Sequence, residues 1–149
     1  MKRAQQLAVS KILFAALSIS LIIVGIAQAQ MDLPAFTGKF TLTNQVQWGK
    51  AVLQPGNYTI TIGSGNNAKY AFVIDGKGRN VGLFRSSFDS RETSAGDALL
   101  IRENAGQLRV YAVALASLGR VLVYDPALAR EAVREARAPQ TVPVMLAKK

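Results

Sequence analysis

Apolar and polar residues alternate along residues 40–48, where every second residue is apolar except Asn44 and the residues between are threonine or glutamine. A period of two predicts a β-strand with one buried side and one side facing solvent. The pattern stops at Gly49 and resumes in the short apolar run 51–53. Residues 40–48 and 51–53 are therefore predicted to form β-structure, with one face of the strand at 40–48 exposed to solvent.

Turn-forming sequences separate further short apolar segments. In Gln54-Pro55-Gly56-Asn57, proline presets one backbone dihedral and glycine accepts a positive one, so the chain is expected to reverse there. Hairpins repeated at such short spacing are typical of all-β proteins. The longest polar stretch, 86–97, is expected to be a loop. The remaining strands are predicted at 58–62, 70–74, 81–84, 99–102, 108–115 and 121–124.

One helix is predicted, over residues 126–137. Asp125 suits the N-cap, Pro126 suits the first helical position, and small apolar residues recur at helical spacing after it. A last strand is expected at 141–146, at a sheet edge because it contains Pro143. These elements predict a mainly β fold, a small antiparallel sandwich or barrel of about seven to nine strands with one C-terminal helix.

The first 29 residues have the pattern of an export signal. Lys2 and Arg3 precede an apolar run over 12–26, and Ala27-Gln28-Ala29 provides the small residues that a signal peptidase requires. We expect cleavage before Gln30 and an exported, periplasmic or secreted domain over 30–149. The alternative is an uncleaved anchor, but a spanning helix needs about 20 apolar residues and this run is shorter.

The composition excludes several classes of enzyme. The chain has neither cysteine nor histidine. Thiol catalysis, thiolate metal sites, histidine-dependent serine hydrolases and most zinc and copper sites are therefore excluded. We expect no catalytic residue, no metal and no cofactor, and a non-enzymatic role in binding a ligand or partner or in the structure of the cell envelope.

The net charge of +9 favours an anionic partner. Without the three basic residues of the signal segment, fifteen basic and nine acidic residues leave +6. Three cations close to aromatic residues in the sequence, Lys69, Arg85 and Arg109, are candidates for an anion-binding surface that contacts an envelope polymer or lipid headgroups. The alternative is a solvated surface of mixed charge, because the basic residues form no run.

Aromatic residues on the predicted strands suggest a ligand pocket. If the helix covered the mouth of a barrel, an apolar small molecule would contact the candidate lining residues Trp48, Tyr58, Phe72, Phe84 and Tyr111. The alternative for these residues is ordinary core packing. The expected partner is an unidentified small molecule or envelope protein. No specific nucleic acid and no transmembrane anchor after cleavage are expected.

Three carboxylates lie within the long polar stretch, and they are the only clustered candidates for acid–base chemistry. Asp89, Glu92 and Asp97 define the alternative of a carboxylate-dependent hydrolase. Their spacing does not match a calcium-binding loop of the EF-hand type, and Arg91 would oppose a cation. A solvated loop is the favoured interpretation.

The hairpin sequence resembles that of a group of small exported proteins of acidobacterial type. The resemblance lies in Trp48-Gly49-Lys50-Ala51-Val52-Leu53 followed by Pro55-Gly56-Asn57-Tyr58, and in Leu122-Val123-Tyr124-Asp125-Pro126 with the alanine-rich segment after it. It extends over most of residues 36–149. It implies a β-rich exported domain and no catalytic residues, and the group has no assigned activity to carry over.

Overall fold

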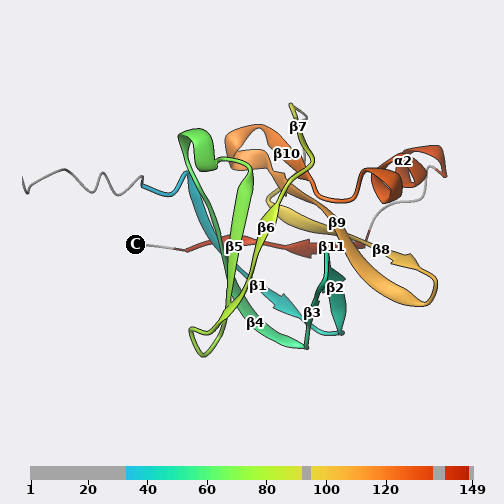
Figure 1. The fold of residues 1–149 in the computed structure, drawn as a ribbon, viewed down its shortest axis with the longest axis horizontal. Helices are drawn as coiled ribbons and strands as arrows, with labels where there is room; N and C mark the ends of the chain where they lie inside the picture. The colour runs from blue at the N-terminus through green and yellow to red at the C-terminus, as the bar shows by residue number, and fades with distance from the viewer. Residues whose placement is uncertain (1–32, 92–94, 136–139, 148–149) are drawn as a thin grey trace, which may run out of the picture. The chain divides into compact units, whose positions relative to one another are not determined.

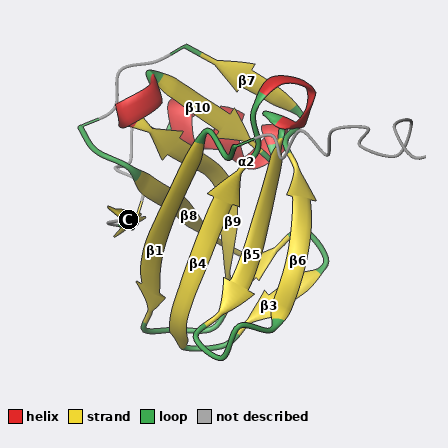
Figure 2. Ribbon diagram, turned by 90° about the vertical axis from the view of Figure 1, so that its left-hand side faces the viewer, coloured by secondary structure: helices red, strands yellow, loops and turns green. Residues whose placement is uncertain are grey.

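Two β-sheets pack face to face in the computed structural model, which describes residues 33–91, 95–135 and 140–147. Sheet A has the strand order β12-β1-β4-β5-β6, and Figure 2 shows its four longer strands side by side in front of the second sheet. Its neighbouring strands are antiparallel. The strands are β1 (Phe36–Leu42), β4 (Gly56–Ile62), β5 (Tyr70–Asp75), β6 (Asn80–Arg85) and β12 (Met145–Leu146).

Sheet B has the order β11-β8-β9-β10-β7, and β2 adds to it by pairing with β3 and, at one parallel bridge, with β9. The sheets do not close into a barrel, so the mainly β prediction is confirmed in its sandwich form (Figure 1). The strands are β2 (Val46–Trp48), β3 (Ala51–Leu53), β7 (Phe88–Ser90), β8 (Ala98–Asn104), β9 (Gln107–Leu115), β10 (Arg120–Val123) and β11 (Gln140–Pro143).

The main core fills the space between the two sheets. Because side chains alternate along β1 and β4, aromatic and branched residues of these strands point inward, where they pack against apolar residues of sheet B. Burying these side chains is the main stabilising contribution to the fold. The largest fully buried members are Trp48, Leu53, Ile60, Ile62, Leu99, Ile101, Leu115 and Leu122.

The described residues contain twelve strands, more than the seven to nine expected, because two predicted strands each divide between the sheets and β7 forms in a segment predicted to be a loop. Residues 40–48 are not one strand. β1 belongs to sheet A, β2 belongs to sheet B, and the exposed residues 43–45 carry the chain across. The segment 141–146 divides in the same way, into β11 of sheet B and β12 of sheet A, with buried Val144 between them.

The polar segment 86–97 is not entirely a loop, because it contains β7, which pairs with β10. The predicted helix forms as α2 (Pro126–Arg134) and is shorter than expected, with its C-cap at Glu135. Its predicted cap is confirmed: the Asp125 carboxylate accepts hydrogen bonds from the backbone N–H groups of Ala127 and Leu128, each at 3.2 Å. The predicted signal segment, residues 1–29, lies outside the described residues, as do 136–139.

A β-bulge in β9 changes which side chains face outward. Leu100 of β8 pairs with Ala112 and Ile101 pairs with Val110, so Tyr111 is the extra residue. Tyr111 and Ala112 therefore both belong to the cluster on the outer face of sheet B, beside Leu128 of α2. The Tyr111 carbonyl oxygen accepts hydrogen bonds from the backbone N–H groups of Tyr124 and Asp125, at 2.8 and 3.1 Å, and these bonds fix the start of α2.

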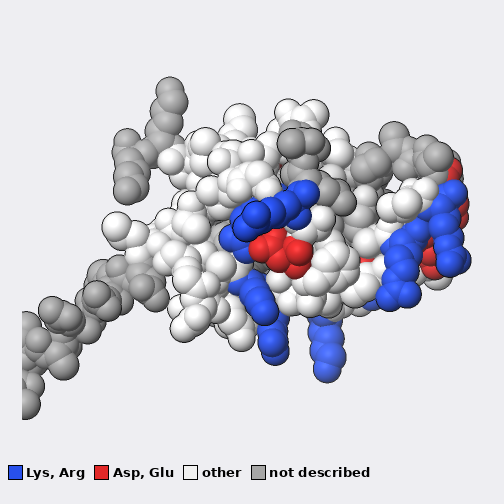
Figure 3. All heavy atoms as spheres, turned by 90° about the horizontal axis from the view of Figure 1, so that it is seen from above, with Lys and Arg blue, Asp and Glu red and all other residues white. Residues whose placement is uncertain are grey.

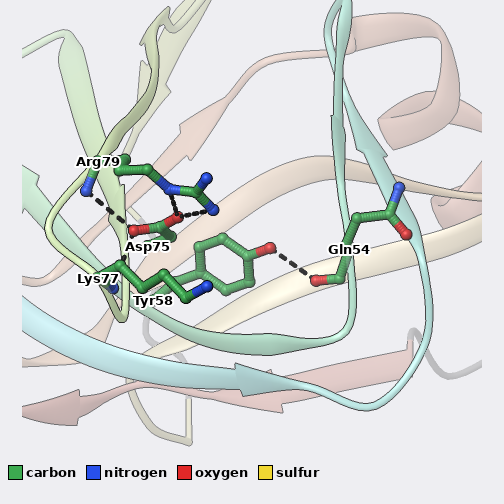
Figure 4. Close-up of polar contacts among 5 residues, drawn as sticks. All are labelled: Gln54, Tyr58, Asp75, Lys77 and Arg79. Carbon is green, nitrogen blue, oxygen red and sulfur yellow. Dashed lines mark hydrogen bonds and ion pairs between the residues drawn. The ribbon is translucent and has the colours of Figure 1, made fainter.

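The turn between β5 and β6 is organised by one carboxylate. Asp75 accepts hydrogen bonds at 2.9 Å from the backbone N–H groups of Arg79 and Lys77, and it pairs with the Arg79 guanidinium at 2.7 Å (Figure 4). The bond from the Arg79 backbone, aided by that side chain, holds the pKa of Asp75 below its usual value although desolvation opposes it.

Asp75 is therefore expected to make the fold sensitive to acid. A carboxyl whose pKa is lower in the folded state stabilises the fold above its unfolded pKa of about 4, and this contribution is lost as the pH falls through the folded pKa. Urea unfolding midpoints measured from neutral pH down to about pH 3 should decline in the wild type and decline less in Asp75→Asn. In the exposed control Glu103→Gln, the urea midpoint should decline with falling pH as it does in the wild type. If the midpoint of Asp75→Asn declines just as much, Asp75 is not the source of the acid sensitivity.

Candidate functional site

A cleft opens at one edge of the sandwich, where β6, the edge strand of sheet A, approaches the β2–β3 hairpin of sheet B. Its cavity volume of about 430 Å³ lies in the range of small-molecule sites, roughly 300–1,000 Å³. We call it the basic cleft and define it by six of its lining residues: Trp48, Lys50, Phe84, Arg85, Arg109 and Tyr124.

Three aromatic rings form the base of the basic cleft. The rings of Trp48 and Phe84 are stacked, with centroids 4.4 Å apart and planes inclined by 8°. Tyr124 meets Trp48 edge to face, at 5.1 Å and 83°. Trp48 is fully buried, whereas Phe84 is half-buried. Because Trp48 packs against both other rings, the base is held in place, and the half-buried Phe84 ring provides its exposed apolar surface.

Gly82 makes room for this stack. A Cβ atom at residue 82 would lie 2.7 Å from Cζ of Phe84 and 3.1 Å from its Cε2, which is closer than such atoms approach. Any larger residue at this position would displace the Phe84 ring. The glycine in β6 therefore sets where the exposed side of the aromatic base lies.

Two polar atoms of the aromatic base lack partners. The indole Nε1 of Trp48 and the hydroxyl of Tyr124 are buried, and neither has a hydrogen-bond partner among the described residues. A buried donor without a partner costs about 1–3 kcal/mol. Desolvation raises the pKa of Tyr124 above its usual value, against a smaller opposing effect of Arg120. The hydroxyl is therefore protonated at neutral pH, and both groups can donate a hydrogen bond.

The charges of the basic cleft are mainly positive. Asp125, which also lines it, is the acidic member, and its carboxylate lies 3.9 Å from the Arg109 guanidinium while it caps α2. No ion pair of the described residues involves Lys50 or Arg85, and both are exposed. Three cations and one carboxylate leave an excess of positive charge over an apolar base.

The structure does not bring the five predicted pocket residues together, because they lie on different faces of the two sheets. Trp48 and Phe84 line the basic cleft. Tyr58 is in the core, stacked on Phe40 at 5.3 Å, and its hydroxyl donates to the Gln54 carbonyl oxygen at 2.6 Å (Figure 4). Phe72 is 40% exposed, and Tyr111 lies on the outer face of sheet B, the face α2 covers.

Two of the three predicted anion-binding residues lie in the basic cleft. Arg85 and Arg109 come from β6 and β9, whereas the exposed Lys69 is not among its lining residues. Lys50 and Tyr124 also line the cleft and were not predicted to do so. Lys50 could have been found, because it lies two residues after Trp48 in the sequence, as close to an aromatic residue as Arg109 is.

The predicted carboxylate cluster has structural partners where it is described. Asp89 pairs with the Arg120 guanidinium at 2.6 Å. Asp97 accepts hydrogen bonds from the backbone N–H and the hydroxyl of Ser117, at 3.0 and 3.1 Å. Glu92 lies outside the described residues. Within the part of the chain that is described, no three side chains of the types that bind metals form a group.

The surface charge is mixed on the face that Figure 3 displays. Acidic and basic side chains lie together there, both in the middle of the face and at the end that carries α2 and the β8–β9 hairpin. Among the described residues, no helix has the length and apolar character needed to cross a membrane.

The resemblance to small exported proteins stays a prediction. In comparisons with known proteins, no family model, no curated protein and no solved structure matches this chain.

Proposed function

We propose that the chain is an exported, non-enzymatic binding domain whose basic cleft holds a small anionic ligand with a flat apolar body. One observation carries the proposal: three cations line a cleft with an aromatic base, and two buried donors of that base have no hydrogen-bond partner among the described residues. The export signal predicted at residues 1–29 supports a role in the periplasm or outside the cell.

The chemistry of the cleft favours a carboxylate, sulfate or phosphate group. Guanidinium groups such as those of Arg85 and Arg109 bind planar or tetrahedral oxyanions through charge-assisted hydrogen bonds. An acceptor oxygen that reached the Trp48 or Tyr124 donor would remove the cost of leaving that donor unpaired. The exposed side of the Phe84 ring, which stacks on the buried Trp48, would contact the apolar part of the ligand.

Titration with phenyl phosphate tests the proposal. Trp48 is the one tryptophan of the chain, so its fluorescence and its single indole N–H resonance report directly from the base of the cleft. We expect the double variant Arg85→Gln/Arg109→Gln to bind phenyl phosphate at least about tenfold more weakly, because a hydrogen bond to a charged group contributes about 1.5–3 kcal/mol. Neutral benzyl alcohol should bind both proteins equally.

Two further variants separate binding from folding. Tyr124→Phe removes only the unpaired hydroxyl, so it should weaken phenyl phosphate binding without lowering the free energy of unfolding. Lys39→Gln/Lys77→Gln removes the same charge at exposed positions outside the cleft and should bind normally. The proposal fails if the two double variants lose the same affinity, since attraction to the overall charge then explains binding, or if the Trp48 signals do not respond.

A further inference from the structure

The outer face of sheet B is apolar, which is unusual for the solvent side of a sandwich. The last six residues of β9 are all buried, and so are the last three of β10, so both strands are covered on both faces. Strands buried on both faces need a second covering layer. On this outer face that layer is α2, which lies beside β9 and β10 at one end of sheet B (Figure 1).

α2 covers the face incompletely. Leu128 is its one buried residue, and Ala129 and Ala132 are half-buried against the sheet. Val133 is 82% exposed although it borders the same face. Alanine fills little space, so an open groove remains between the helix and the strands. We call it the helix groove and define it by Phe88, Leu100, Ala112, Val121, Ala132 and Val133.

The helix groove is large enough for a chain-like ligand. Its cavity volume is about 520 Å³, within the roughly 300–1,000 Å³ of small-molecule sites. Phe88 of β7 borders it and is 47% exposed, so a large aromatic side chain has apolar surface left to bury. A slender alkyl chain would cover this surface and gain about 0.8 kcal/mol for each CH₂ group that it buries.

The basic and acidic side chains of α2 lie in different places, and this separation indicates that a ligand of the helix groove carries a negative charge at one end of its chain. Arg130 and Arg134, one turn apart, line the helix groove. Glu131 and Glu135 line a separate hollow beside it, and Glu135 pairs there with Arg102. No aspartate or glutamate of the described residues lines the helix groove, and neither arginine forms an ion pair with a described residue. The groove is therefore apolar along its length and cationic beside the helix.

We infer that the helix groove binds a single-chain fatty carboxylate, with the alkyl chain between α2 and sheet B and the carboxylate at Arg130 and Arg134. This site is distinct from the basic cleft and does not depend on the function proposed there. The two arginines would pair with the head group, and the alanines leave the space that the tail fills.

Calorimetric titration with decanoate below its micellar concentration tests the inference. Ala132→Leu fills the groove with a good helix former and should weaken decanoate binding at least about tenfold. The control Ala127→Leu adds the same side chain at an exposed helix position and should bind as the wild type does. Arg130→Gln/Arg134→Gln should weaken decanoate about tenfold and leave 1-decanol unchanged, whereas butyrate, which has the charge without the tail, should not bind detectably.

Several results would overturn the inference. The first is the absence of decanoate binding. The second is equal decanoate binding by Ala132→Leu and Ala127→Leu. The third is a loss of decanoate affinity in Arg130→Gln/Arg134→Gln no greater than the loss in Lys39→Gln/Lys77→Gln. A wild-type dimer that Ala132→Leu dissociates would show that a second copy of the chain covers the groove instead. Because Arg85→Gln/Arg109→Gln should bind decanoate normally, this test can fail while the proposal for the basic cleft stands, and the reverse also holds.

Discussion

Replacement of Trp48 by alanine is expected to lower the free energy of unfolding by about 3–5 kcal/mol, the usual cost of truncating a buried tryptophan. Trp48 is fully buried in the core between the sheets, and Phe84 and Tyr124 pack against its ring. Removing the indole would leave a cavity that two aromatic residues line. A domain of this size has a total stability of only about 5–15 kcal/mol, so the variant should be close to unfolding.

Urea unfolding followed by circular dichroism measures this effect, because the variant lacks the fluorescent reporter. Trp48→Phe should cost much less than Trp48→Ala, since it keeps a ring in the stack and removes an indole N–H that has no partner in the described part of the chain. Phe88→Ala serves as the exposed control and should change stability by about 1 kcal/mol or less. If Trp48→Ala cost no more than Phe88→Ala, the aromatic base would not be part of the core.

Replacement of Gly38 by alanine is expected to destabilise the fold by about 1–3 kcal/mol, the cost of overpacking. In most strands alanine is better than glycine, because glycine loses more backbone freedom on folding. At Gly38 the new Cβ atom would lie 2.5 Å from Cγ1 of Val144 and 2.8 Å from the Phe36 ring. Both neighbours are buried, so they have little room to move.

A double-mutant cycle tests the proposed clash. Val144→Ala removes the nearer of the two contacts, so Gly38→Ala should cost about 1 kcal/mol less in that background than in the wild type. The relief is expected to be partial, because the Phe36 ring remains close. Additive effects in urea unfolding would show that Val144 is not what excludes a side chain at residue 38.

The strands of this fold could be predicted because their signals are local. Alternation in residues 40–42 and 58–62, and the proline–glycine turn between them, depend on neighbouring residues alone. The cap at Asp125 is equally local. The crossings at Asn44 and Val144 could not be predicted. Asn44 interrupts the apolar positions of residues 40–48, but the same period resumes at Val46, so the pattern does not reveal that the chain has changed sheet.

The candidate site was harder to predict than the fold, because its residues come from separate strands. The bulge at Tyr111 changes which residues of β9 face outward, and nothing in that apolar run marks it. A strict period of two therefore misplaces Tyr111. Arg85 and Arg109 were found through aromatic residues near them in the sequence, but the aromatic base that they share is a tertiary feature.

The division of the last strands between the two sheets sets the order in which the protein can fold. Gly38 of β1 pairs with Leu146 of β12, and β11 pairs with β8 in the other sheet. These contacts join distant parts of the chain, and contacts of that kind form slowly. Until residue 146 has been synthesised, one edge of β1 stays unpaired and Val144 cannot fill the core. The last step of folding is thus delayed until the end of this segment emerges.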